Sequence, residues 1–194
     1  MAWDIQLRDD SGTVHYSLWM GHERYYVLPD GRHCEAPQRI AWCEKCRQFE
    51  IAQEVPALSE IDSCLEAIPN GPEALRNWFV AEGEPVPQYY LTQKWEWFSE
   101  MLLDRYRLMR DWRVLRHSPP RCFECYSFDV DLLPKNSSET IDRINGQHLH
   151  IGCNSHSHLI NRWSFDVEGL PLKARISKSQ SAGTEGGLRD TSVP

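Results

Sequence analysis

Four cysteines in two pairs are the residues whose spacing most clearly indicates chemistry. The segment AWCEKCRQFE carries Cys43 and Cys46, and PPRCFECYSF carries Cys122 and Cys125. A two-residue spacing lets both thiolates of a pair reach one ion, and two such pairs supply four ligands for tetrahedral Zn²⁺. Thiolates without carboxylates favour zinc, with iron as the alternative. Because four protein ligands leave no position for water, we expect one structural zinc ion per chain.

The two pairs resemble the metal knuckles of zinc-ribbon, or rubredoxin-like, proteins. The resemblance covers WCEKC and RCFEC with their flanking strands. Glycine often follows the second cysteine of such a knuckle, whereas Arg47 and Tyr126 stand there in this chain. The gap of 75 residues between the pairs is far longer than in a minimal ribbon. The resemblance therefore implies a zinc knuckle that is interrupted by a large insertion.

A group of histidines is the second candidate site. The segment HLHIGCNSHSHLI contains His148, His150, His156 and His158. If HLHIG and HSHLI pair as a hairpin across CNS, each pair of histidines shares one face of its strand. Imidazoles on one sheet face can hold a second metal ion with an open position, as in a metal-dependent hydrolase or nuclease. The favoured alternative is a half-exposed strand that binds no metal.

Familiar catalytic signatures are absent from the sequence. It contains no P-loop, no dinucleotide-binding glycine motif, no nucleophile elbow and no H-E-x-x-H motif. Whether the protein is an enzyme therefore stays open, and the balance favours a non-enzymatic protein.

Charge is distributed unevenly along the chain. The net charge is −7 over 194 residues, which argues against a general nucleic-acid binder. Residues 50–104 carry 11 acids and 2 bases, whereas residues 105–121 carry 6 arginines and 1 aspartate. Steps of roughly 100° per residue scatter these arginines around a helix axis. A solvated helix is therefore favoured over a ribbon that binds nucleic acid through these arginines, which is the third hypothesis for function.

Aromatic residues within the acidic block suggest a protein partner. Buried aromatic residues dominate the energy of many interfaces, and acidic residues steer a basic partner. We expect Trp78, Tyr89 and Tyr90 to act as anchors and Glu82 and Glu84 to attract a basic protein surface. Charge reversal at the two glutamates should then slow association and leave thermal stability unchanged.

Periodicity and turn residues predict an α+β fold. Strands are expected in the first forty residues and after residue 126, with helices at about 59–68, 72–83 and 90–116. Residues 126–134 and 163–171 share the letters S-F-D-V and are predicted to form equivalent strands.

The predicted architecture is a single zinc-braced domain over residues 1–172, followed by a flexible tail at 173–194. An antiparallel sheet carries the four-cysteine knuckle, and three helices at about 58–117 are inserted between the cysteine pairs.

The compartment and the favoured function follow from composition. The start of the chain lacks a secretory signal, and no apolar run reaches the roughly 18 residues that span a bilayer. We therefore expect a cytoplasmic protein that does not enter a membrane. The favoured function is a zinc-stabilised protein-interaction module, such as an adaptor, a subunit or an immunity-type inhibitor.

Overall fold

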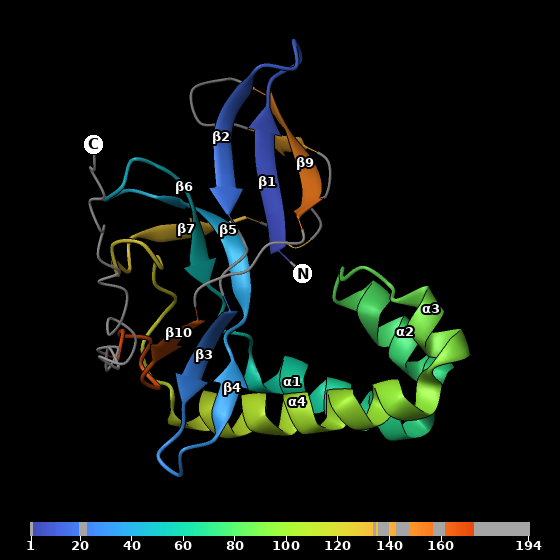
Figure 1. Ribbon diagram of the computed structural model, residues 1–194. Coiled ribbons are helices and arrows are strands. Elements are labelled where there is room, and N and C mark those ends of the chain that lie inside the picture. The colour runs from blue at the N-terminus through green and yellow to red at the C-terminus, as the bar shows by residue number, and fades with distance from the viewer. Residues whose placement is uncertain are drawn as a thin grey trace, which may run out of the picture.

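The computed structural model describes residues 2–19, 23–133, 135, 140–142, 148–156 and 162–172. Over these residues the chain has an α+β fold with four α-helices and three small sheets, which confirms the predicted class. Figure 1 shows the longest helix, α4, running along one side of the molecule with α1 beside it. The strands lie over one end of this helix pair, and α2 and α3 extend from the other end.

The first sheet has the order β2-β1-β9-β8 and is antiparallel throughout. Its strands are β1 (Ala2–Arg8), β2 (Val14–Trp19), β8 (Thr140–Asp142) and β9 (His148–His156). The turn between β1 and β2 forms because the Asp9 carboxylate accepts hydrogen bonds from the backbone N–H groups of Ser11 and Thr13. The strands expected in the first forty residues are thus present at the start of the chain, where β1 and β2 form a hairpin.

The second sheet has the order β10-β3-β4. It consists of β3 (Glu23–Val27), β4 (His33–Glu35) and β10 (Arg162–Phe165). The β3–β4 pair is antiparallel, but β10 lies parallel to β3. The second sheet is therefore mixed, and β10 joins β3 only after the chain has passed through all the helices.

The third sheet has the order β6-β5-β7 and carries the cysteines. It consists of β5 (Gln38–Cys43), β6 (Gln48–Gln53) and β7 (Val130–Leu132). Both pairings are antiparallel, and Cys43 lies opposite Gln48 on β6 and Val130 on β7. The chain thus leaves this sheet for the helices after β6 and returns to it as β7.

The helices lie between the two cysteine pairs, as predicted. They are α1 (Leu58–Ala67), a 3₁₀ turn (Ile68–Asn70), α2 (Pro72–Ala81), α3 (Gln88–Gln93) and α4 (Trp95–Leu115). The single long helix predicted at about 90–116 is wrong, because it is broken at Lys94 (φ −140°).

The break has a packing consequence. The Tyr90 ring stacks on Phe98 with a centroid separation of 5.1 Å. In an unbroken helix, residues eight apart lie about 12 Å apart along the axis, so this stacking requires the break.

Two clusters of buried side chains stabilise the fold. The larger cluster joins the strands to α1 and α4, and at its centre the Tyr26 ring stacks on Trp112 with a centroid separation of 4.3 Å. The smaller cluster lies among the helices and includes Leu75, Trp78 and Phe98. Tyr106 packs against both clusters. The helical insertion therefore has a core of its own that is continuous with the core under the strands.

The two S-F-D-V segments are not equivalent, so that prediction is wrong. Phe128 precedes β7, is 46% exposed and lies under the guanidinium of Arg121. Phe165 ends β10 and is 1% exposed, and Val167 lies in the turn that follows. The same four letters therefore take different structures, because one copy follows the second cysteine pair at the surface and the other packs into the main core.

The single domain over residues 1–172 stays a prediction. The predicted tail at 173–194 lies outside the described residues. Among the described helices, none combines the length and the apolar composition that crossing a bilayer requires.

Candidate metal centre

The four cysteine sulfurs lie together, within 4.8 Å of one another. The Sγ atoms of Cys43 and Cys125 are 3.5 Å apart, and those of Cys46 and Cys122 are 4.0 Å apart. A tetrahedral ion with Zn–S bonds of about 2.3 Å places its sulfur ligands about 3.8 Å apart. A disulfide would bring two sulfurs to about 2.05 Å. The arrangement therefore fits one metal ion held by four thiolates.

Two matching backbone loops position these sulfurs. The N–H of Arg47 donates to the carbonyl oxygen of Cys43 at 2.8 Å, and the N–H of Tyr126 donates to that of Cys122 at 3.0 Å. Arg47 (φ 56°) and Tyr126 (φ 59°) are the only non-glycine residues with positive φ in the part of the chain that the structure describes.

The left-handed backbone explains why glycine is common at these two positions in similar knuckles. A non-glycine residue there costs roughly 1–2 kcal/mol. Such strain persists only where the surrounding structure imposes it. Here the left-handed residue closes each loop, and the closed loop places the second thiol of the pair beside the first.

The second loop is anchored on the strands that follow the first. Cys122 bridges to Ala52 on β6, and the N–H of Phe123 donates to the carbonyl of Ile51 at 3.1 Å. The N–H of Gln53 donates to the carbonyl of Arg121 at 2.8 Å. The point where the chain leaves for the helices therefore adjoins the point where it returns, and a bound ion would link the two.

The thiols differ in burial and in proton affinity. Burial raises the pKa of Cys122 to about 12, and it also raises the pKa of Cys46. Burial alone would raise the pKa of Cys125, but hydrogen bonds from the Ser127 N–H and the neighbouring thiols lower it. The N–H of Cys46 donates to the Cys43 sulfur, 3.5 Å away. A metal ion must therefore displace protons when it binds, so its affinity falls as the pH is lowered.

The histidine hairpin is not formed. Residues 148–156 are one continuous strand, β9, so CNS is not a turn and the predicted hairpin is wrong. His150 is exposed, and its Nε2 atom lies 2.7 Å from the Asp10 carboxylate. His158 lies outside the described residues, and the metal role proposed for His148 and His156 stays a prediction. Across the described ranges, the four cysteines are the only group of three or more potential ligands close enough to share an ion.

The arginines at 105–121 all have partners within the chain. Arg105, Arg107 and Arg110 form ion pairs with Glu35, Asp104 and Asp62, and Arg113 and Arg121 donate to backbone carbonyls. Arg116 differs because it is 1% exposed and donates to the Gln53 side chain at 2.6 Å and to the carbonyls of Ser118 and Pro119. The sequence does not indicate that Arg116 is buried, because it is one of several arginines in this segment.

The residues predicted to bind a partner occupy different environments. Trp78 is 7% exposed, and its indole N–H donates to the Ser63 hydroxyl at 3.0 Å, so it belongs to the helical core. Tyr89 and Tyr90 are 59% and 39% exposed. Trp97, near the start of α4, is 56% exposed.

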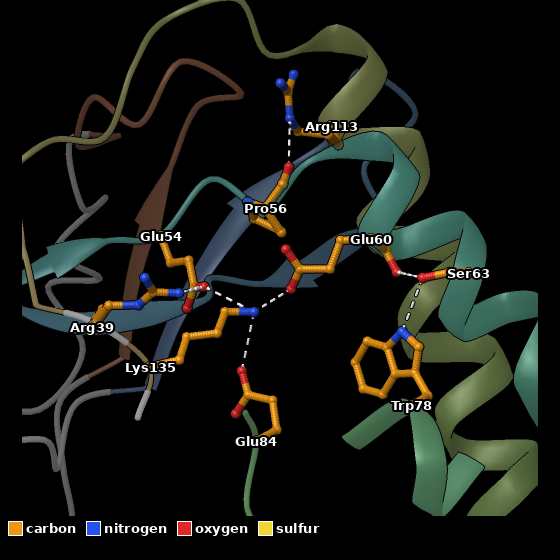
Figure 2. A network of polar contacts seen from close by, with 9 residues as sticks. All are labelled: Arg39, Glu54, Pro56, Glu60, Ser63, Trp78, Glu84, Arg113 and Lys135. Carbon is orange, nitrogen blue, oxygen red and sulfur yellow. Dashed lines mark hydrogen bonds and ion pairs between the residues drawn. The ribbon is translucent and has the colours of Figure 1, made fainter. Parts of the chain in front are cut away.

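A cluster of charged residues centred on Lys135 was not anticipated. Figure 2 shows the Lys135 ammonium among the carboxylates of Glu54, Glu60 and Glu84, which come from separate parts of the chain. Charge reversal at Glu84 was expected to leave thermal stability unchanged. Because Glu84 is 3.2 Å from Lys135, we now expect that reversal to lower the thermal stability. Glu82 makes no ion pair with the residues that the structure describes, and its role in partner binding stays a prediction.

Comparison with protein-family models, with curated proteins and with solved structures finds no match to this chain.

Proposed function

We propose that this chain is a zinc-stabilised protein-interaction module, in which zinc braces the fold and the helical insertion contacts another protein. The observation that carries the proposal is a group of exposed aromatic rings on α3 and α4. We call Tyr89, Tyr90, Trp97 and Met101 the aromatic patch.

The metal centre supports a structural role for the ion. Four thiolates complete a tetrahedral shell, so no position is left where water or a substrate could bind. Soft sulfur ligands in this geometry favour zinc over the hard divalent ions. The centre lies where the chain enters and leaves the helical insertion, so a bound ion would hold these two segments together.

The aromatic patch is a rigid surface. Tyr90 lies between the other two rings, with centroids 5.4 Å from Tyr89 and 6.0 Å from Trp97, and it stacks on the buried Phe98. Rings fixed in this way lose little side-chain entropy when a partner covers them. Contiguous exposed aromatic residues are also typical of interaction sites.

The charge around the aromatic patch favours a basic partner. Glu96 and Glu100 are exposed on α4, and Glu82 is half-buried at the end of α2. Acidic residues at the rim of an interface speed the association of a basic partner and disfavour acidic ones. An adaptor, a subunit or an inhibitor in the cytoplasm would use such a surface.

The proposal is tested by comparing matched aromatic substitutions. Wild-type protein, Tyr89→Ala with Trp97→Ala, and the control Phe128→Ala are used to capture proteins from native lysate, and the captured protein is then purified and titrated. Loss of a residue at the centre of an interface costs about 2 kcal/mol or more, which is roughly a 30-fold loss of affinity. We expect this loss in the double variant and none in the control. Equal binding by all three proteins would refute the proposal.

A further inference from the structure

The four sulfurs of the metal centre form two close contacts between the loops that carry them. The Sγ atom of Cys43 is 3.5 Å from that of Cys125, and the Sγ atom of Cys46 is 4.0 Å from that of Cys122. A disulfide needs its sulfurs at about 2.05 Å, so the members of each pair must approach by only roughly 1.5–2 Å. We call these two contacts the cross-loop pairs.

Each cross-loop pair joins a partly exposed thiol to a buried one. Cys125 and Cys46 are partly exposed, whereas Cys43 and Cys122 are both 0% exposed. An oxidant dissolved in water therefore meets Cys125 and Cys46 first, and a second thiol lies beside each of them. An accessible thiol next to a second thiol that can form a disulfide with it is typical of redox-sensitive cysteines.

We propose that peroxide oxidises this centre to two disulfides, Cys43–Cys125 and Cys46–Cys122, and that these bonds then hold the loops together in place of the ion. The inference rests on the zinc brace of the proposed function and does not involve the aromatic patch. The helical insertion is thus held at its base in two states, one reduced and metal-bound, the other oxidised and metal-free.

The reaction consumes one molecule of hydrogen peroxide for each disulfide. The Cys125 thiolate attacks one peroxide oxygen, the O–O bond breaks, and hydroxide leaves while the sulfur becomes a sulfenic acid. The Cys43 thiolate then attacks that sulfur, so the S–S bond forms, the S–O bond breaks and a second hydroxide leaves. Two thiolates thus lose two electrons, and one peroxide gains them as two hydroxide ions. Cys46 and Cys122 react in the same way, after which no thiolate remains to hold the ion.

Bonds between the loops are favoured over bonds within a loop. The two cysteines of each loop are three residues apart, whereas the cross-loop pairs are 82 and 76 residues apart. A disulfide stabilises a fold mainly by constraining the unfolded chain, and this effect grows with the length of chain that the bond closes. While any thiolate remains, it can attack a neighbouring disulfide and exchange partners. Oxidation therefore ends in the more stable pairing, which is the one between the loops.

The test maps the disulfides of the full, zinc-loaded chain after titration with hydrogen peroxide. Remaining thiols are blocked with N-ethylmaleimide, and the chain is cut with trypsin and with a glutamate-specific protease. Trypsin cuts after Lys45 and the second protease after Glu124, so the two cysteines of each loop lie on separate peptides. Mass spectrometry then identifies which peptides are linked, and a chromogenic chelator measures the zinc that is released.

We expect the Cys43 peptide linked to the Cys125 peptide and the Cys46 peptide linked to the Cys122 peptide, with release of about one zinc ion per chain. Bonds within either loop would overturn the proposal, as would a bond from Cys43 to Cys122. Oxidation to sulfinic acid without any disulfide, or thiols that stay reduced, would overturn it as well.

A second measurement determines whether the oxidised centre still holds the fold. Circular dichroism compares the peroxide-treated, zinc-free protein with reduced protein from which a chelator has removed zinc. We expect the oxidised protein to keep its strands and the reduced protein to lose them, because only the former retains bonds between the loops. A dithiol reductant added to the oxidised protein together with the chelator should then unfold it. Loss of the strands on oxidation would overturn the proposal.

Cys34→Ala is the matched control, because Cys34 is buried and lies outside the cluster. It should give the same linked peptides and the same zinc release as wild type, and a different disulfide map would overturn the assignment. The outcome is also separable from the proposed function. Protein that contains no zinc would refute the metal brace, but its disulfide map would still decide the pairing. Capture of a partner through the aromatic patch depends on neither result.

Discussion

The metal centre and the Lys135 cluster both join segments that are far apart in the chain, but they do so in different ways. At the metal centre, two five-residue loops fix each pair of thiols locally, and the fold only has to bring the loops together. At the Lys135 cluster, each charged group comes from a different element and no local rule links them. A site built from local loops can be recognised in a sequence, whereas one assembled from single side chains cannot.

The two regions should also differ in energy. Structural zinc binding in small metal domains is worth about 10–16 kcal/mol, which is as large as the whole net stability of about 5–15 kcal/mol of a typical domain. Removing one partner of a fully buried ion pair costs about 3–5 kcal/mol, and partial exposure reduces that cost. We therefore expect the fold to depend on the metal centre and to tolerate loss of the Lys135 cluster.

The largest effect is expected at the metal centre. Cys122→Ser should abolish binding of about one zinc ion per chain and unfold the strands, because a hydroxyl is a poor replacement for a thiolate ligand. Metal analysis and circular dichroism measure the two results. Cys34→Ala is the control, since Cys34 is buried but lies outside the cluster. Full zinc content in Cys122→Ser would show that the four cysteines are not the site.

A smaller effect is expected when the central cation is removed. Lys135→Met keeps much of the side-chain volume but leaves three carboxylates without their shared partner, so stability should fall by about 2 kcal/mol. Zinc content should not change. Denaturant unfolding measures the loss, and a cost similar to that of Cys122→Ser would contradict the distinction between the two regions.

The stability difference between wild type and Lys135→Met should depend on pH, because it comes from the charge of Lys135. Burial alone would lower the pKa of Lys135, but its hydrogen bond to Glu60 and the nearby carboxylates raise it above the ordinary value of 10.5. A group whose pKa is raised in the folded state stabilises the fold at pH values below its unfolded pKa, and that contribution is lost as pH rises through the folded value. The stability gap between wild type and Lys135→Met should thus stay constant from about pH 7 to 10 and shrink above. A gap that does not begin to shrink as pH rises above the ordinary value of 10.5 would contradict a charge effect.

Two neighbouring glutamates provide a finer comparison. Glu84→Lys places a second cation beside Lys135 and should cost about 1 kcal/mol, a modest value because the Glu84 side chain is 34% exposed. Glu82→Lys should change stability by less than about 0.5 kcal/mol. Thermal unfolding of both variants measures the difference, and equal melting temperatures would place Glu84 outside the cluster.

The smallest effect on stability is expected in the aromatic patch. Tyr89→Ala removes a ring that is 59% exposed, so the free energy of unfolding should change by less than about 0.5 kcal/mol. Phe98→Ala removes the buried ring beneath the patch and should cost about 3–5 kcal/mol. If Tyr89→Ala were the more destabilising change, the patch would be part of the core and not a surface for a partner.

Much of the local structure could be predicted from residue patterns. Proline, glycine and serine positions placed the first two helices within one or two residues of α1 and α2. The break at Lys94 could not be predicted in this way, because the apolar spacing continues through it, and the stacking of Tyr90 on Phe98 that the break permits joins two separate helices. The parallel pairing of β10 was missed for a related reason, since strand patterns carry no information about direction.

By itself the sequence determined the four-cysteine cluster, the α+β class and the insertion of helices between the cysteine pairs. These features follow from short-range rules, namely the reach of thiols two residues apart and the periods of helices and strands. Only the tertiary structure decided which aromatic residues are buried and which arginine enters the core. It also decided that Lys135 meets three glutamates, because contacts between distant side chains depend on how the elements pack, and that packing leaves no periodic trace in the chain.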